Sequence, residues 1–192
     1  MDPFIARVFI GCEREIVASL SKTCELWFLG SRDNIVKLYV RSCDRKNLRS
    51  VKAKVIFFRN NEGIILVDSH ILAELIERYD VINIVFSEGR IYVDILVDIV
   101  EILKRVLREI HERKCFVRLV EQIPVREYFI SLTPKQRVVL ETAIKSGYFD
   151  TPRRINLNKL SVELKCSVST LHEHLRKVTS KIIKNYLVRN SI

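Results

Sequence analysis

The apolar periodicity of the chain changes at the segment EQIPVREYFISLTP, residues 121–134. Before this segment, period-two runs rich in β-branched residues alternate with runs whose apolar residues are spaced i, i+3, i+4. After it, only the helical spacing remains. The segment itself carries two prolines, which favour a connection over a regular element. We therefore predict an α+β domain at residues 1–124, followed by an all-α domain at residues 125–192.

The pattern in the first region alternates in a fixed order. It predicts strands at 4–10, 24–30, 35–41, 53–59, 63–68, 81–87, 90–96 and 115–121, and helices at 12–21, 44–51, 69–79 and 97–113. This order is βαββαβ written twice, and βαββαβ is the order of a ferredoxin-like unit. We expect tandem ferredoxin-like units at 1–60 and 61–124, packed together with their helices on one side, as a sensor or dimerisation domain.

The first helix of the second region has clear boundaries. Thr133 is a favourable N-cap, Pro134 suits the first helical position, and Gln136 completes a capping box. Gly147 supplies a left-handed stop. The apolar stripe of this helix consists of Val139, Leu140, Ala143 and Ile144.

Two further helices follow in close succession. Asn156 caps a helix that runs through Lys165, and Ser167 caps a third helix from Val168 to about Leu187. At 100° per residue, the inner face of the third helix consists of Leu171, Leu175, Val178, Ile182 and Tyr186. Two helices joined by a tight turn, the second with a polar and basic outer face, are typical of the helix-turn-helix.

The net charge of +10 is concentrated in the second region. Residues 125–192 hold 13 Lys and Arg against 5 Asp and Glu, whereas residues 1–124 hold 20 against 18. A small, strongly basic segment beside a nearly neutral one indicates a polyanion-binding module attached to something else.

Double-stranded DNA is the polyanion that this helix arrangement fits. Glu173 can accept from a cytosine amino group and Arg176 can fork onto a guanine, although either can equally contact phosphate or water. The candidates for base reading are Ser169, Thr170, His172, Glu173 and Arg176. The candidates for phosphate contact are Lys135, Arg153, Arg154, Lys159, Ser167 and Lys177.

The same residues carry a family resemblance. They are Leu132-Thr133-Pro134, Gln136-Arg137, Gly147-Tyr148-Phe149, Pro152-Arg153, Ser167, Ser169-Thr170-Leu171 and His174-Leu175-Arg176. This pattern resembles the helix-turn-helix domain of the archaeal bacterio-opsin activator family. The resemblance implies an archaeal DNA-binding transcriptional regulator with a sensor-like N-terminal region. The chain departs from the family at Ser161, Lys165 and Cys166. Either Lys165 adopts a left-handed conformation, at a cost of roughly 1 kcal/mol, or the turn differs locally from that of the family.

Other chemistry finds little support in the sequence. Neither a Gly-rich phosphate loop, nor G-x-S-x-G, nor H-E-x-x-H is present, so we expect no enzyme, no cofactor and no metal. His172 and His174 lie about 200° apart on a helix and cannot share a metal, and His174 is expected to be a packed structural residue. Asp94 and Asp98 are a conceivable carboxylate pair, but we expect them to be solvated or to favour a helix N-terminus.

The five cysteines include no C-x-x-C, and the favoured interpretation is buried free thiols. Disulfides remain an alternative, because a composition rich in Ile, Val, Lys, Arg and Glu with two Gln is typical of heat-adapted proteins. Without an apolar run of membrane length or a secretory leader, the chain is expected to be cytoplasmic and away from membranes.

Together these features predict a sequence-specific DNA-binding regulator that forms a homodimer. Its N-terminal domain would bind a small effector or a protein partner such as the transcription machinery. The dimer surface is either the N-terminal sheet or the exposed end of the last helix. One alternative is a ligand- or protein-binding module with a nonspecific nucleic-acid tether. Another is an enzyme that uses an unrecognised pocket between the two βαββαβ units.

Overall fold

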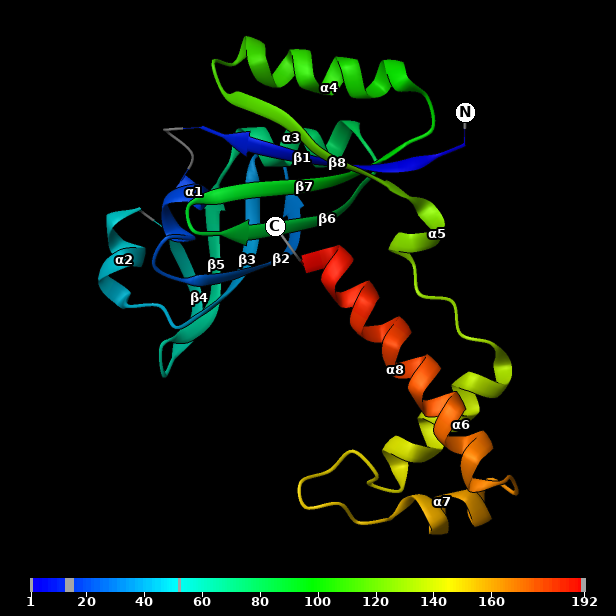
Figure 1. The fold of residues 1–192 in the computed structure, drawn as a ribbon. Coiled ribbons are helices and arrows are strands. Elements are labelled where there is room, and N and C mark those ends of the chain that lie inside the picture. The colour runs from blue at the N-terminus through cyan, green and yellow to red at the C-terminus, as the bar shows by residue number, and fades with distance from the viewer. Residues whose placement is uncertain (1, 13–15, 52, 191–192) are drawn as a thin grey trace. The chain divides into compact units, whose positions relative to one another are not determined.

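The structure is a computed structural model that describes residues 2–12, 16–51 and 53–190 (Figure 1). It divides into two compact units, Met1–Val125 and Arg126–Ile192. We call them unit 1 and unit 2. Unit 1 contains antiparallel sheets and helices, and unit 2 contains helices. The prediction of an α+β region followed by a helical region is therefore confirmed. Within the described residues, no helix is both long enough and apolar enough to span a bilayer.

Unit 1 follows the predicted order of strands and helices. Its elements are β1 (Phe4–Gly11), α1 (Ile16–Leu20), β2 (Glu25–Arg32), β3 (Ile35–Arg41), α2 (Arg45–Ser50), β4 (Lys54–Arg59), β5 (Glu62–Asp68), α3 (His70–Arg78), β6 (Val81–Ser87), β7 (Arg90–Val97), α4 (Val100–Glu112) and β8 (Phe116–Pro124). The sequence pattern predicts that the first helix begins at residue 12. The structure begins it at Ile16, and residues 13–15 lie outside the described residues.

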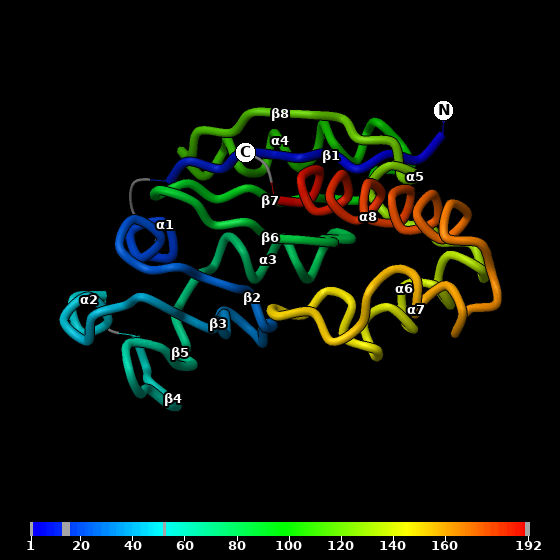
Figure 2. Tube along the Cα trace, turned by 60° about the horizontal axis from the view of Figure 1, so that its bottom comes forward, coloured from blue at the N-terminus to red at the C-terminus, as the bar shows by residue number. Residues whose placement is uncertain are grey.

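The strands form two four-stranded sheets whose membership does not follow the two halves of the chain (Figures 1 and 2). Sheet A has the order β6-β7-β1-β8, and sheet B has the order β2-β3-β5-β4. Every pairing between neighbouring strands is antiparallel. Each half of the chain therefore places its first strand in the sheet made by the other half. Periodicity predicts that a segment is a strand, but it does not specify the partner strand.

The two sheets differ in how their faces are covered. The central strands of sheet A, β1 and β7, are buried along nearly their whole length. Helix α4 packs on β7 and β8 through Leu103, Val106 and Ile110. Sheet B alternates instead: Val36, Leu38 and Val40 of β3 are fully buried, while the residues between them point away from the core.

A buried ion pair joins the two central strands of sheet A. Arg7 on β1 and Asp94 on β7 are direct neighbours. Arg7 donates from Nε to Asp94 Oδ1 at 2.7 Å and from Nη2 to Oδ2 at 2.8 Å. Both side chains are at most 2% exposed, so the expectation that Asp94 is solvated is wrong. The reason is that β1 and β7, which are distant in the sequence, pair at the centre of a sheet whose central strands are buried. This pairing places Arg7 and Asp94 side by side, away from solvent. Asp98 is exposed.

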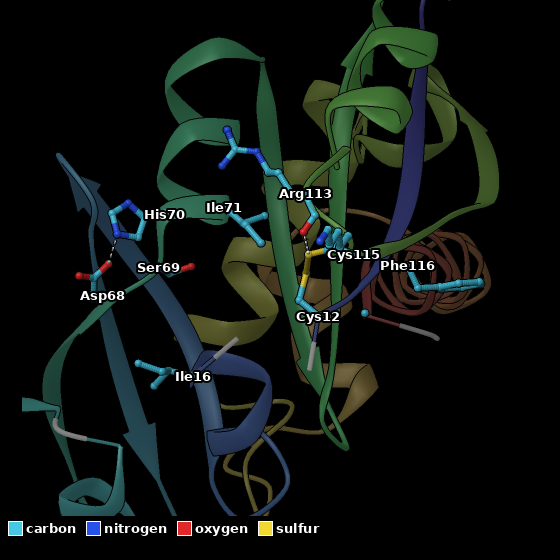
Figure 3. Close-up of a pocket in the computed structure, with 11 residues that line it drawn as sticks. Cys12, Ile16, Asp68, Ser69, His70, Ile71, Arg113, Cys115 and Phe116 are labelled. Atoms are coloured by element: carbon cyan, nitrogen blue, oxygen red, sulfur yellow. Dashed lines mark hydrogen bonds and ion pairs between the residues drawn. A yellow bond between two sulfur atoms is a disulfide. The ribbon is translucent and has the colours of Figure 1, made fainter. Parts of the chain in front are cut away.

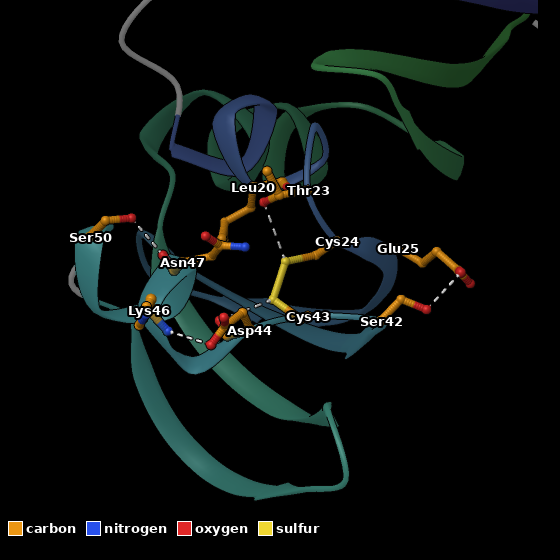
Figure 4. The surroundings of a disulfide bond; sticks show 10 residues. All are labelled: Leu20, Thr23, Cys24, Glu25, Ser42, Cys43, Asp44, Lys46, Asn47 and Ser50. Carbon is orange, nitrogen blue, oxygen red and sulfur yellow. Dashed lines mark hydrogen bonds between the residues drawn. A yellow bond between two sulfur atoms is a disulfide. The ribbon is translucent and has the colours of Figure 1, made fainter.

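Four of the five cysteines form disulfides, so the prediction of free thiols is wrong for them. Cys12 bonds to Cys115, and Cys24 bonds to Cys43 (Figure 4). The pairing of Gly11 with Phe116 brings the first two together, with Cα atoms 4.7 Å apart. The hairpin of β2 and β3 brings the second two together, at 4.6 Å. Both separations are within the usual disulfide range. Cys166 is free, as predicted, but it is half-buried and not buried.

Unit 2 contains four helices in its described part: α5 (which starts at the last residue of unit 1, Val125–Tyr128), α6 (Pro134–Lys145), α7 (Leu157–Glu163) and α8 (Val168–Asn190). Its core is formed by Val139, Ala143, Leu160, Leu171 and Leu175. Three residues predicted to be inside are exposed instead: Ile144 by 55%, Ile182 by 38% and Tyr186 by 65%. Ile182 and Tyr186 lie beyond Val178, the last buried residue of α8, so the core of unit 2 ends before it reaches them. Ile144 lies at the edge of the apolar stripe of α6, next to the buried Ala143.

Candidate nucleic-acid interface

Helix α6 is fixed at both ends by local hydrogen bonds. Thr133 and Gln136 form the predicted capping box, with reciprocal bonds of 3.1 and 3.2 Å. At the other end, Gly147 has a φ of +74°. There the amide of Tyr148 donates to Ala143 O and that of Gly147 to Ile144 O. These two bonds define a Schellman motif, which satisfies carbonyls that the helix end leaves free.

The turn between α7 and α8 uses the same motif without a glycine. Lys165 has a φ of +51°, so of the two alternatives that the sequence left open the left-handed conformation is the one adopted. The amide of Cys166 donates to Ser161 O, and the amide of Lys165 donates to Val162 O. Ser161 is buried and its hydroxyl donates to Asn158 O at 2.7 Å. A small residue with its hydrogen bond satisfied within α7 allows α8 to pack closely against that helix.

Ser167 caps the N-terminus of α8, as predicted. Its hydroxyl accepts from the amide of Thr170 at 3.1 Å. It also shares hydrogen bonds with the hydroxyls of Ser169 at 3.0 Å and Thr170 at 2.7 Å. All three side chains are exposed. The first turn of α8 therefore presents a cluster of hydroxyls beside a helix N-terminus, where partial positive charge favours an anion.

One turn further along, a carboxylate on the outer face of α8 holds two cations. Arg176 donates to both oxygens of Glu173, from Nε and Nη2, at 3.0 Å each. Lys177 Nζ lies 3.2 Å from Glu173 Oε1. Hydrogen bonds from Arg176 and then from Lys177 lower the pKa of Glu173 to about 2. The side chains of Arg176 and Lys177 are nevertheless 63% and 55% exposed, so both remain accessible to a partner.

The loop between α6 and α7 brings a further arginine to the same helix. The Arg153 guanidinium lies 4.8 Å from the centre of the Tyr148 ring. Tyr148 and Arg153 line a groove of about 540 Å³ together with His172 and Arg176 of α8. Arg154 is separate from this groove and pairs with Asp150 at 2.6 Å. The structure thus brings Arg153 of the loop to His172 and Arg176, which follow it by 19 and 23 residues in the sequence.

Two predicted phosphate contacts are not drawn into this cluster. Lys135 lies in the first turn of α6, next to Gln136, which accepts from Lys181 of α8 at 3.1 Å. Because Lys181 follows Ser169 by 12 residues, Lys135 lies roughly 18 Å along the helix from the hydroxyl cluster. Lys159 is exposed on α7, and no described side-chain contact joins it to α8. His174 is half-buried.

The distal half of α8 is anchored by contacts that the sequence did not reveal. Asn185 Nδ2 donates to the carbonyl of Tyr128, and the Arg189 guanidinium lies 5.5 Å from the centre of the buried Tyr128 ring. Lys181 Nζ also donates to Ser131 O at 2.8 Å. These contacts attach the segment before α6 to α8. In the sequence, Lys181, Asn185 and Arg189 appear only as polar residues spaced one helical turn apart. The same spacing is typical of a solvent-exposed helix face, so it did not predict these contacts.

Unit 1 contains a cavity of about 750 Å³ near the start of α3 and the end of α4 (Figure 3). The Cys12–Cys115 disulfide lines it, and so do the apolar side chains of Ile71 and Phe116. Its charged lining is Asp68, His70, Arg113 and Lys114. Asp68 and His70 pair with each other at 3.4 Å, and Arg113 pairs with Glu74. The cavity has the size and mixed lining of a small-molecule site.

Comparison with known proteins identifies the second unit. Residues 132–184 match the family model described as "HTH DNA binding domain", which confirms the resemblance to the bacterio-opsin activator type of helix-turn-helix. Two proteins of Haloferax volcanii are similar in this region. One, provisionally named a transcriptional regulator, is 47% identical over 55 residues. The other, the transcriptional regulator NarO, is 43% identical over 56 residues.

These matches leave most of every chain uncovered. Each covers 29% of the present chain, and the aligned segment spans 10% of the first relative and 26% of NarO. The similarity therefore identifies the helix-turn-helix domain and does not extend to unit 1.

Proposed function

Because residues 132–184 form a helix-turn-helix domain of the bacterio-opsin activator type, we propose that this protein is a sequence-specific, DNA-binding transcriptional regulator. The N-terminal half of α8 is its recognition helix and enters the major groove. The observation that carries this proposal is the exposure of the polar outer face of α8 on a helix whose other face is held in a core. A major groove about 12 Å wide admits such a helix.

The side chains on this face have different proposed roles. Arg176 reads a guanine and is oriented for this by its fork on Glu173. Glu173 can accept from a cytosine amino group beside it. His172, Ser169 and Thr170 complete the proposed base-reading set. Glu173 also pairs with Lys177. Arg176 and Lys177 must therefore give up contacts with the Glu173 carboxylate to contact DNA, and this favours a ligand that offers several acceptor groups at once.

The proposed phosphate contacts flank this helix. Arg153 stacks on Tyr148, so its guanidinium is held in place while it remains exposed. Ser167 is at the N-terminus of α8, and Lys177 is on the outer face. Lys135, Arg154 and Lys159 are exposed cations that would contact the backbone farther from the recognition helix. Such contacts provide sequence-independent affinity and salt dependence.

For unit 1 we propose an effector- or partner-binding role, carried by the 750 Å³ cavity. We also infer that its two sheets are ferredoxin-like units that have exchanged their first strands. Interchange of β1 and β5 supports this inference, because it would give the sheets β8-β5-β7-β6 and β4-β1-β3-β2. In each of these antiparallel sheets the strands of one half of the chain would lie in the order fourth, first, third, second. The regulator is non-enzymatic, acts in the cytoplasm, and reads two half-sites as a homodimer.

In the competing function, unit 1 is a ligand- or protein-binding module and unit 2 only tethers it to nucleic acid without sequence preference. Selection of bound duplexes from a random library distinguishes this tether from a sequence-specific regulator. The full chain should enrich one sequence, and Arg176→Ala should relax the preference at one position. A Lys159→Ala control should weaken binding to all duplexes alike and reduce the salt slope by about 1. A steep salt dependence with no enriched sequence, unchanged by Arg176→Ala, would establish the tether instead.

A further inference from the structure

An apolar row crosses the outer face of sheet B. Trp27 on β2 neighbours Tyr39 on β3, Tyr39 neighbours Ile64 on β5, and Ile64 neighbours Phe57 on β4. The rings of Trp27 and Tyr39 lie 5.4 Å apart. Trp27 is 44% exposed and Phe57 is 56% exposed. The row therefore spans all four strands on the face that points away from the core of unit 1.

A row of alternating charges runs beside it. Glu25 on β2 neighbours Arg41 on β3, and Glu62 on β5 neighbours Arg59 on β4. The pairing of Val40 on β3 with Gly63 on β5 places Arg41 and Glu62 next to each other. All four charged residues are exposed. Across the sheet the order is negative, positive, negative, positive, and the Tyr39 hydroxyl fixes Glu62 by donating to it at 2.7 Å.

This pattern is complementary to itself under a two-fold rotation. Two copies of sheet B can be placed face to face, related by a two-fold axis in the plane between them. The axis is parallel to the strands and lies over the line between β3 and β5. The rotation keeps each row at its own height and reverses its order. Glu25 then faces Arg59 of the second copy, and Arg41 faces Glu62 of the second copy. In the apolar row, Trp27 faces Phe57. An interface of this kind is isologous, as two-fold dimers require.

We propose that the outer face of sheet B is the dimerisation surface of this protein, and that its occupant is a second copy of the same chain. This inference deepens the proposed dimeric reader, on which it rests, by identifying the surface that joins the two copies. Four strands about 4.8 Å apart and about seven residues long give a flat face of roughly 15 by 24 Å. That is smaller than the roughly 800 Å² per partner of a standard interface, so the dimer should dissociate on dilution.

The exposed end of α8 is less suited to self-association. Ile183, Tyr186 and Leu187 are exposed there, but the charged side chains of that segment are Lys181, Lys184 and Arg189. A two-fold pairing of α8 with itself would bring cations together, which is unfavourable. On sheet B the same operation brings opposite charges together. The charge pattern therefore distinguishes the two apolar surfaces.

Charge exchange across the interface tests the proposal. Sedimentation equilibrium of the full chain gives the monomer–dimer dissociation constant. Arg59→Glu or Glu25→Arg alone should raise this constant on the order of tenfold at low salt, because each creates two like-charge contacts per dimer. The double variant Glu25→Arg/Arg59→Glu should return it toward the wild-type value. Arg118→Glu, an exposed position on β8 of sheet A, should leave it unchanged.

The double variant separates an interface from a local effect. Within one chain it places a cation at position 25 beside Arg41 and an anion at position 59 beside Glu62, so a purely structural role predicts that it is worse than either single variant. That result would overturn the proposal, as would a wild-type chain that is monomeric at every concentration, or single variants that dimerise normally. Binding of each variant to a single half-site duplex is measured in parallel. A failure there, with dimerisation as predicted, would count against DNA reading and not against this surface.

Discussion

Units 1 and 2 are stabilised by contacts of different range along the chain. Unit 1 depends on strand pairs distant in sequence, on a buried ion pair between residues 7 and 94, and on a disulfide that spans 103 residues. The specifying contacts of unit 2 are mostly short: a capping box, two Schellman turns and two N-caps, each closed within six residues. Single long-range contacts therefore contribute large free energies in unit 1, whereas the stability of unit 2 is the sum of many small contributions.

Removing the long disulfide should produce the largest effect. Closing a loop of about 100 residues contributes about 4.7 kcal/mol in the chain-entropy model, so Cys12→Ser/Cys115→Ser should reduce the free energy of unfolding of unit 1 by about that amount. The only tryptophan, Trp27, lies in unit 1, and its fluorescence during denaturant unfolding reports on that unit. Cys166→Ser, at the free cysteine of unit 2, is the matched control and should not move the transition. If the double variant is as stable as the wild type, the disulfide does not contribute to the stability of unit 1.

Breaking the buried ion pair should come next. Asp94→Ala deprives Arg7 of a bidentate partner inside sheet A and should cost about 3–5 kcal/mol. Arg7→Met/Asp94→Leu should recover much of the loss, because the charge is removed with its partner. The exposed pair of Lys104 with Glu101 provides the comparison, since Lys104→Ala should cost at most about 1 kcal/mol. Equal costs for the two pairs would show that burial does not set the difference.

The two Schellman turns of unit 2 should respond with opposite signs. Gly147→Ala forces an L residue into a left-handed conformation, costing about 1–2 kcal/mol, and its Cβ would lie 2.4 Å from Arg154 Nε. Lys165→Gly relieves the same conformation and should stabilise unit 2 by up to about 1 kcal/mol. Amide hydrogen exchange of α6 and α7 measures both. Destabilisation by Lys165→Gly would mean that its side chain, not its backbone, matters there.

The smallest effect should be the titration of Glu173. Its pKa of about 2 lies below the ordinary 4.5 because Arg176 and Lys177 hydrogen-bond to the carboxylate. The contribution of this pair to stability is therefore complete above pH 4.5 and is lost as the pH falls toward 2. Side-chain NMR should show a midpoint near 2 that rises toward 4.5 in Arg176→Ala. An unchanged midpoint in that variant would contradict the assigned cause.

The same contrast of local and long-range contacts explains what the sequence could predict. The caps at Thr133, Asn156 and Ser167 were predictable, because each depends on neighbours within a few residues. The sequence also narrowed the turn at Lys165 to two alternatives. The strands of unit 1 were predictable as strands. Their sheets were not, because nothing in the period of β1 indicates that it pairs with β7 and β8.

The failures follow from that missing information. The sequence pattern predicts a solvated Asp94 and a free thiol at Cys12, because the partners of these residues are 87 and 103 residues away. In the candidate interface, the residues of α8 could be placed on one face by helical geometry. The approach of Arg153 to His172 and Arg176 could not, since a loop without periodicity gives no direction to the chain.

The most direct test of base reading by α8 couples one side chain to one base atom. In the selected duplex, each guanine is replaced in turn by 7-deazaguanine, which lacks the N7 acceptor in the major groove. At one position this should weaken binding of the wild type on the order of tenfold, within the range of a bidentate contact, and leave the affinity of Arg176→Ala unchanged. If every replacement weakens both proteins equally, or neither, then Arg176 does not read a guanine and the proposed recognition helix is contradicted.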